Sequence, residues 1–174
     1  MRAHVTMLAA AFVVVGAGTA CADTVTMNAI DASGVGKAIG TISLSDASEG
    51  LVVMPDLTDL PAGDHGIHVH VNPDCGPGAG ADGRPVAGFA AGGHYDPANT
   101  GKHLGPRGDG HKGDLPALNV DPGGNATNAI VAPHLKLADV KGRSIMIHAG
   151  GDNYSDQPNP LGGGGPRIAC GVIK

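Results

Sequence analysis

Residues 65–71 read His-Gly-Ile-His-Val-His-Val, an alternation of histidine and apolar side chains. An alternation with a period of two predicts a β-strand, because successive side chains of a strand point to opposite faces of the sheet. His68 and His70 therefore project from one face, and the apolar side chains between them point to the other. This strand can bury one face in a hydrophobic core and direct two imidazoles to a common point with the other.

Further alternating or apolar segments lie on both sides of this stretch, separated by Gly, Asp or Pro. They cover residues 24–29, 39–43, 51–54, 129–132, 144–148 and 168–173. Glycine (30 residues) and proline (13) are frequent, aromatic residues make up 2%, and no long helical or heptad pattern occurs, which favours short strands joined by turns. About eight strands without a βαβ rhythm predict an all-β fold, an eight-stranded antiparallel Greek-key barrel or sandwich.

The N-terminal segment, residues 1–22, differs in composition from the rest of the chain. Arg2 precedes an apolar run, and the small residues at 20–22 resemble the cleavage site of a secretory signal peptide. The run falls well short of the roughly 20 residues that span a bilayer. We therefore expect a cleaved signal without a membrane span, one mature domain at residues 23–174, and an exported protein, periplasmic or extracellular. Lipidation of Cys21 is the alternative that the sequence leaves open.

The charge balance argues against one class of partner. The chain has 11 lysines and arginines against 16 aspartates and glutamates, a formal net charge of −5. Binding to nucleic acid depends on a basic surface, so no nucleic-acid partner is expected. An anionic substrate would need positive charge focused locally.

Cysteine usage agrees with export. Once Cys21 leaves with the signal, Cys75 and Cys170 remain as an even pair, and in an oxidising compartment such a pair predicts a disulfide. The bridge would close a loop of about 95 residues and stabilise the fold by roughly 4 to 5 kcal/mol in the chain-entropy description. Two buried free thiols are the alternative.

Two long stretches, residues 73–115 and 150–165, have hardly any strand pattern. Long loops in a compact domain are usually functional or disordered, and the histidines of the first loop favour a function. The glycine-rich run at residues 78–83 matches a dinucleotide fingerprint, but no apolar strand precedes it and no helical pattern follows, so nucleotide binding is rejected.

The first loop carries His94, His103 and His111, with Asp114 three residues after the last. Imidazoles combined with one carboxylate suit zinc. His148, at the end of an apolar strand, adds a donor from a distant part of the sequence. A single histidine on a strand is most often a partly exposed polar residue, but this set favours a metal site.

Five ordered motifs resemble the copper,zinc superoxide dismutase family, across nearly all of the chain after residue 22. They are His68-Val69-His70, Gly93-His94, His103-Leu104-Gly105-Pro106, residues 110–115 (GHKGDL) and residues 165–173 (GPRIACGVI). Residues 153–156 (NYSD) and the four glycines at 162–165 resemble the bacterial branch. The resemblance implies a Greek-key barrel with long metal-binding and electrostatic loops.

The resemblance also implies the ligands and the reaction. Copper would be bound by His68, His70, His94 and His148, and zinc by His94, His103, His111 and Asp114. His94 would bridge the two ions and carry a proton between steps. Redox cycling of the copper would disproportionate superoxide to oxygen and hydrogen peroxide, while zinc has a structural role. Relatives include monomers and homodimers, and the sequence does not choose between these states.

Positions around the ligands also match the family. The resemblance makes Arg167 the arginine that guides superoxide to copper, and Asp152 the aspartate that accepts hydrogen bonds from one copper and one zinc histidine. A solvated arginine and a turn aspartate are the alternatives. His65 would be structural and His134 a surface residue. The loop from residue 75 to residue 93 departs from bacterial relatives, because Asp82 and Arg84 are its charged residues.

A different class of function uses the same histidines. A secreted module could sequester copper or zinc without turnover. Sequestration requires neither an arginine beside an open coordination position nor an imidazole shared by unlike ions. The sequence therefore favours the dismutase over the storage protein.

Overall fold

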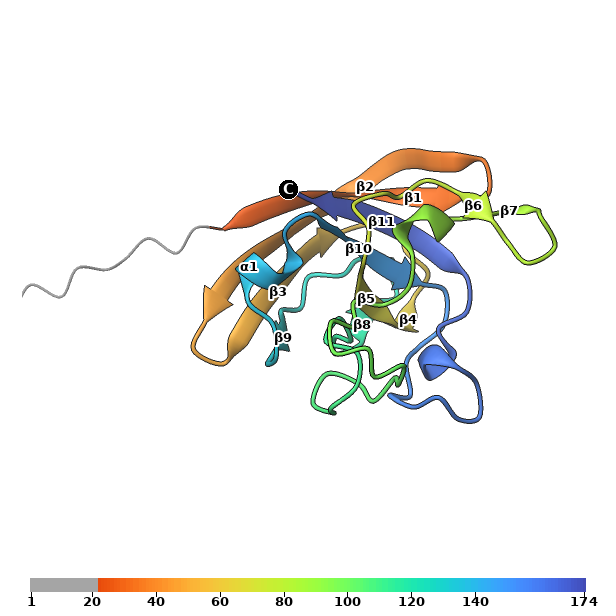
Figure 1. The fold of residues 1–174 in the computed structure, drawn as a ribbon. Coiled ribbons are helices and arrows are strands. Elements are labelled where there is room, and N and C mark those ends of the chain that lie inside the picture. The colour runs from red at the N-terminus through yellow and green to blue at the C-terminus, as the bar shows by residue number, and fades with distance from the viewer. Residues whose placement is uncertain (1–21) are drawn as a thin grey trace, which may run out of the picture.

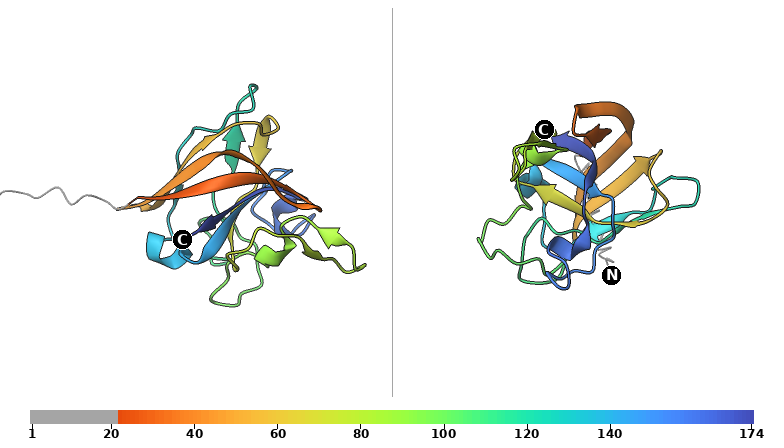
Figure 2. Two further views of the ribbon diagram at one scale, coloured as in Figure 1. Left: turned by 90° about the horizontal axis from the view of Figure 1, so that it is seen from above. Right: turned by 90° about the vertical axis from the view of Figure 1, so that its right-hand side faces the viewer.

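The computed structural model describes residues 22–174, and a curled antiparallel sheet of seven strands dominates it (Figure 1, Figure 2). In spatial order the strands are β5 (Ile67–His70), β10 (Arg143–His148), β11 (Arg167–Ile173), β1 (Asp23–Asp31), β2 (Gly34–Ala47), β3 (Gly50–Leu57) and β9 (Ile130–Ala132). Neighbours such as β11 and β1 are far apart in sequence, as the crossing connections of a Greek key require. The prediction of an all-β antiparallel fold is confirmed.

Shorter elements complete the fold. β4 (Gly63–His65) pairs with β8 (Leu118–Val120), and β6 (Gly78–Ala79) pairs with β7 (Pro85–Val86). Helical structure in the described chain is limited to α1 (Leu137–Val140) and to the 3₁₀ turns η1 (Phe89–Ala91) and η2 (Leu161–Gly163). These residues therefore form eleven strand segments, more than the predicted eight, because two- and three-residue strands leave no periodic pattern in the sequence.

The predicted strand at residues 65–71 is divided at Gly66. His65 pairs with Leu118 of β8, whereas Ile67 pairs with Ile147 of β10. The Gly66 N–H donates to the Gly150 carbonyl at 2.8 Å, and its carbonyl accepts from the His148 N–H at 2.8 Å. The chain thus changes partners at this glycine, which directs His68 and His70 away from the β4–β8 pair.

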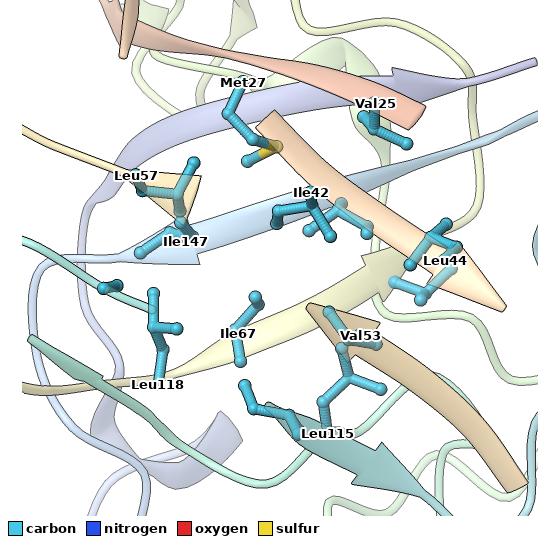
Figure 3. Close-up of a cluster of buried hydrophobic side chains, with 14 of the residues drawn as sticks. Val25, Met27, Ile42, Leu44, Val53, Leu57, Ile67, Leu115, Leu118 and Ile147 are labelled. Carbon is cyan, nitrogen blue, oxygen red and sulfur yellow. The ribbon is translucent and has the colours of Figure 1, made fainter. Parts of the chain in front are cut away.

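The inner side of the sheet packs around one main cluster of buried apolar side chains (Figure 3). Ten of its members are labelled in Figure 3: Val25, Met27, Ile42, Leu44, Val53, Leu57, Ile67, Leu115, Leu118 and Ile147. Strand residues supply all of them except Leu115, which lies just before β8, and Val25 and Met27 or Ile42 and Leu44 show the alternation expected of a half-buried strand. Ile67 and Ile147 belong to the two strands that also carry metal-ligand candidates, so the core fixes those strands directly.

The predicted disulfide is present and joins the loop after β5 to β11. Cys75 and Cys170 are 95 residues apart in sequence, and their Cα atoms are 5.7 Å apart. A second apolar cluster, formed by Ile30, Ala91 and Met146, surrounds the two cysteines. The bridge therefore ties a long loop to the sheet beside a packed cluster.

The predicted signal peptide at residues 1–22 falls almost wholly in the segment 1–21, outside the described residues, as does Cys21 with its possible lipidation. Among residues 22–174, no helix is long and apolar enough to cross a membrane.

Candidate metal centre

The first long loop, residues 73–115, carries three candidate histidines and is called the metal-binding loop below. Part of it lies along the free edge of β5. The Val69 N–H donates to the Gly113 carbonyl at 2.9 Å, and the Tyr95 N–H donates to the Val69 carbonyl at 2.8 Å. Isolated bridges pair His68 with Asp114 and His70 with His94. Backbone pairing therefore sets two loop residues beside the two strand histidines, although His94 lies 24 positions after His70 in the sequence.

Glycine is needed where the loop meets this edge. A Cβ atom on Gly113 would lie 2.4 Å from the Val69 carbonyl oxygen and 2.9 Å from the Tyr95 nitrogen. Such distances cannot be accommodated against backbone atoms, so a side chain at residue 113 would push the loop away from β5. The GHKGDL motif thus contains a steric requirement besides its two ligand candidates.

Four histidine rings converge at one end of β5 and β10. The ring centroids of His68 and His94 are 3.9 Å apart, and those of His68 and His148 are 4.9 Å apart. One donor nitrogen from each of His68, His70, His94 and His148 lies within 4.8 Å of the others. The structure thus brings together the four residues predicted to hold copper.

The hydrogen bonds of these rings leave one nitrogen of each directed inward. His68 Nε2 donates to Asp152 Oδ2 at 2.8 Å, His70 Nδ1 donates to the Gly92 carbonyl at 2.9 Å, and His148 Nδ1 donates to the Gly165 carbonyl at 3.1 Å. Within residues 22–174, the opposite nitrogens of these rings and His94 Nε2 are buried and have no hydrogen-bond partner. Unpartnered buried nitrogens are costly, and four converging imidazole lone pairs suit copper.

A second group of donors forms on the other side of His94. His94 Nδ1 lies 2.9 Å from Asp114 Oδ1, and His103 Nδ1 lies 2.9 Å from Asp114 Oδ2. His111 Nδ1 is 3.5 Å from Asp114 Oδ1. Three nitrogens around one carboxylate match the predicted zinc set, and His94 presents one nitrogen to each group of donors.

His111 is the outermost member of this second group. The set of donor atoms that lie within 4.8 Å of one another contains His68, His94, His103 and Asp114 and does not include His111. His68, however, directs its unpartnered Nδ1 towards the first group and its Nε2 to Asp152. His111 Nδ1 is itself buried without a hydrogen-bond partner in the described chain, so we keep it as the fourth zinc ligand of the prediction.

Asp152 connects the two groups from outside. Its Oδ2 accepts a hydrogen bond from His68 and its Oδ1 accepts one from His103, each at 2.8 Å. A Cβ atom on Gly162 would lie 2.0 Å from Asp152 Oδ1, so a glycine of the four-glycine run makes room for this carboxylate. One side chain thus orients one ring of each group, as outer partners of metal ligands do.

Asp156 is a further anchor that sequence reasoning quoted in a motif but gave no role. Its Oδ2 accepts from the His103 N–H at 2.9 Å, and its Oδ1 accepts from the Leu161 N–H at 3.2 Å. The loop between β10 and β11 therefore holds the backbone of His103 as well as its ring.

Arg167, at the start of β11, is fixed by the backbone of the disulfide-bonded loop. Its guanidinium donates to the carbonyls of Gly88 at 2.6 Å and Gly92 at 2.7 Å. The Gly92 carbonyl also accepts from His70, so the guanidinium and a copper-ligand candidate share one acceptor. Phe89, whose ring centroid is 5.6 Å from the guanidinium carbon, lies beside it and was not foreseen, because anchoring through carbonyls leaves no sequence pattern.

The remaining described histidines have the predicted environments. His65 is buried, with Nδ1 2.7 Å from the His148 carbonyl and Nε2 2.8 Å from the Pro61 carbonyl. It joins β4 to the end of β10, a structural position. His134 is exposed, in the turn between β9 and α1.

Burial and hydrogen bonding give the two groups different proton affinities. Burial lowers the pKa of His68 to about 3 and that of His148 to about 4, so both rings are neutral at pH 7. Burial also acts to lower the pKa of His103, but hydrogen bonds to Asp114 and Asp152 outweigh it and raise this pKa to about 9. Burial acts to raise the pKa of Asp114, yet its histidine partners lower it well below the usual range. The second group thus pairs an imidazolium with carboxylates.

Comparison with known proteins identifies the family. The family model described as copper/zinc superoxide dismutase matches residues 38–173. This chain belongs to the copper/zinc superoxide dismutase family. The relative named "Superoxide dismutase [Cu-Zn]" from Escherichia coli K12 is 52% identical over 165 residues, which cover 94% of this chain and 95% of the relative.

Solved structures of family members support the Greek-key barrel. A copper/zinc superoxide dismutase from Brucella abortus, 55% identical, superposes with a TM-score of 0.86 and covers 88% of this chain and 99% of its own. The solution structure of a monomeric copper, zinc superoxide dismutase from Salmonella enterica, also 55% identical, has a TM-score of 0.80 and covers 88% of this chain and 100% of its own. The family membership therefore rests on both sequence and fold.

Proposed function

We propose that this chain disproportionates superoxide to oxygen and hydrogen peroxide at a centre that holds one copper and one zinc ion. Copper is held by His68, His70, His94 and His148, and zinc by His94, His103, His111 and Asp114. The observation that carries the proposal is His94, which presents one nitrogen to each group of buried donors. An imidazole can serve two cations in this way only after losing both ring protons.

The donor chemistry fits the two metals differently. Four imidazole nitrogens support both oxidation states of copper, and copper supplies the one-electron chemistry that takes an electron from one superoxide and returns it to the next. The three imidazoles and one carboxylate of the second group would supply four ligands to zinc, the number that a structural zinc ion takes. Asp152 keeps the rings of His68 and His103 oriented through its two oxygens.

Arg167 binds the anionic substrate. A guanidinium has five N–H groups, and the carbonyls of Gly88 and Gly92 use one on each terminal nitrogen. The remaining donors and the fixed positive charge are available to superoxide beside His70. His94 Nε2 can hold a proton whenever it does not coordinate a metal, which makes it a local proton donor for the peroxide product.

Other charged residues contribute little to the steering of superoxide on the hairpin formed by β6 and β7. Arg84 is 86% exposed and lies 3.7 Å from the Asp82 carboxylate, and such exposed pairs partly cancel each other's field. We therefore assign the main guiding charge to Arg167.

The protein is proposed to act outside the cytoplasm. Residues 1–22 match a signal peptide, the mature domain begins at residue 23, and the Cys75–Cys170 disulfide suits an oxidising compartment such as the periplasm. We propose a monomer, with a homodimer as the alternative, since the Salmonella enterica relative is described as monomeric.

The experiment that tests this function compares the protein reloaded with copper and zinc, with copper alone and with zinc alone. The proposal expects superoxide disproportionation in the copper-containing samples and none with zinc alone. Sequestration, the competing function, expects both ions to bind tightly without turnover in any sample. Stoichiometric copper binding without catalysis would therefore overturn the proposal.

A further inference from the structure

His134 is a described histidine that neither belongs to the proposed ligands nor, like His65, has a structural role. It lies in the turn between β9 and α1, about 20 residues after the metal-binding loop ends, and its side chain is exposed. The fold nevertheless returns it to that loop. A groove of about 340 Å³ is lined by His134 together with His111 and Asp114.

This groove reaches the zinc donors where they are most accessible. The side chain of His111 is 9% exposed, whereas His94 is 1% exposed and both His103 and Asp114 are 0% exposed. A cation in solution therefore meets His111 before the other three donors. The Asp114 carboxylate lies behind that point, together with His111 Nδ1, which has no hydrogen-bond partner among residues 22–174.

The two sides of the groove are held together by an ion pair. Lys112, next to His111, lies 2.9 Å from Asp139 on α1, and the two side chains are 32% and 28% exposed. Asp139 also accepts from the Lys136 N–H at 2.9 Å, which fixes the start of α1 directly after the turn that carries His134. His134 is thus kept at the rim of the groove. The exposed Asp109 on the loop side adds a negative charge that attracts cations.

We propose that this groove is the route by which Zn²⁺ reaches and leaves its site, with His134 as a transient ligand on the way. A hydrated zinc ion exchanges one water for the His134 imidazole, and then further waters for His111, Asp114 and the inner donors. Imidazole is a preferred zinc ligand, so each exchange replaces one lone pair with another and involves no electron transfer. The inference rests on the proposed zinc site.

The test measures zinc transfer rather than dismutation. Zinc uptake by copper-loaded, zinc-free protein is followed by stopped-flow mixing, and release from the holoprotein is followed with a colorimetric zinc chelator. In His134→Ala both rates should fall about tenfold, because a transient ligand lowers a barrier that is common to both directions. The equilibrium dissociation constant should not change.

Two further variants separate a ligand from a merely structural residue. His134→Asp should recover most of the lost rate, since a carboxylate oxygen also binds zinc. Asn128→Ala removes an exposed polar side chain just before β9, away from the groove, and should behave as the wild type.

Several results would overturn the route. Wild-type rates of zinc uptake and release in His134→Ala would contradict the route. So would a weaker zinc affinity of this variant at an unchanged uptake rate. A His134→Asp variant as slow as His134→Ala would contradict it as well. Failure of the underlying site would look different: His111→Ala would keep the full zinc content, or the wild type would bind no zinc.

Discussion

The two halves of the metal centre are built from different parts of the fold. Three of the proposed copper ligands, His68, His70 and His148, come from β5 and β10, whose other face is packed in the hydrophobic core. Three of the proposed zinc ligands come from a loop whose position depends on backbone pairing with β5 and on the carboxylates of Asp152 and Asp156. The sheet therefore preforms the copper half, whereas the zinc half requires the loop to be held in place.

His94 joins the two halves, so its removal should have the largest effect. In His94→Ala both ions lose a ligand, and we expect zinc content to fall, the copper absorption spectrum to change and activity to be lost. Metal analysis and visible spectroscopy of the reloaded variant measure this. Unchanged content and spectra for both metals would show that the imidazole is not shared.

Substitution of Asp152 tests how far the zinc half depends on the carboxylates that hold its loop. In Asp152→Asn the side-chain amide cannot accept from both rings, and changes to such outer partners typically cost about 10- to 100-fold in metal affinity. We expect this loss for zinc and a smaller one for copper, because the sheet still positions three copper ligands. Competition titrations with chelators measure both affinities, and an equal loss for the two ions would contradict the comparison.

Substitution of Arg167 tests the copper half of the centre without replacing any proposed metal ligand. Replacement by glutamine removes the positive charge, and we expect the rate with superoxide to fall by about tenfold or more and to depend less on ionic strength. Copper should remain bound, because none of its four ligands changes. Dismutation rates at several salt concentrations, together with copper analysis, test this prediction. Full activity in the variant would show that Arg167 does not guide superoxide.

The number of protons released on metal binding should also differ between the copper and zinc halves, although this effect is smaller than those of the substitutions. At pH 7.5 His103, with its pKa of about 9, is protonated, whereas His68 and His148, with pKa values of about 3 and 4, are neutral. Zinc must displace the His103 proton, so zinc binding should release about one proton per ion, and copper binding should release none from these two rings.

Calorimetry in buffers of different ionisation enthalpy measures this release. For zinc it should disappear as the pH rises above about 9, where His103 is already neutral. The two ions are added separately to metal-free protein, because the second His94 ring proton leaves only when both ions are bound. Equal proton release for copper and zinc under these conditions at pH 7.5 would contradict the assignment of protons to the loop side.

Sequence reasoning reached furthest where side chains carry a pattern. The alternation at residues 65–71 predicted β5 and the shared face of His68 and His70, and the two cysteines predicted the disulfide. The division of that strand at Gly66 escaped prediction, because the exchange of partners is made by backbone hydrogen bonds to Gly150 and His148.

The surroundings of the site were less predictable for the same reason. Arg167 is anchored by the Gly88 and Gly92 carbonyls, and main-chain acceptors leave no trace in residue type. Gly162 makes space for Asp152, which appears in the sequence as one of four consecutive glycines. The ligand roles carried over from the family remain predictions until the metals are observed on these residues.

The most direct measurement is a crystal structure of the copper- and zinc-loaded protein, with anomalous diffraction recorded at the absorption edges of both metals. We predict a copper peak among His68, His70 and His148, a zinc peak among His103, His111 and Asp114, and the His94 ring between the two peaks. Two ions with no ring in common, or one ion occupying both groups of donors, would contradict this account.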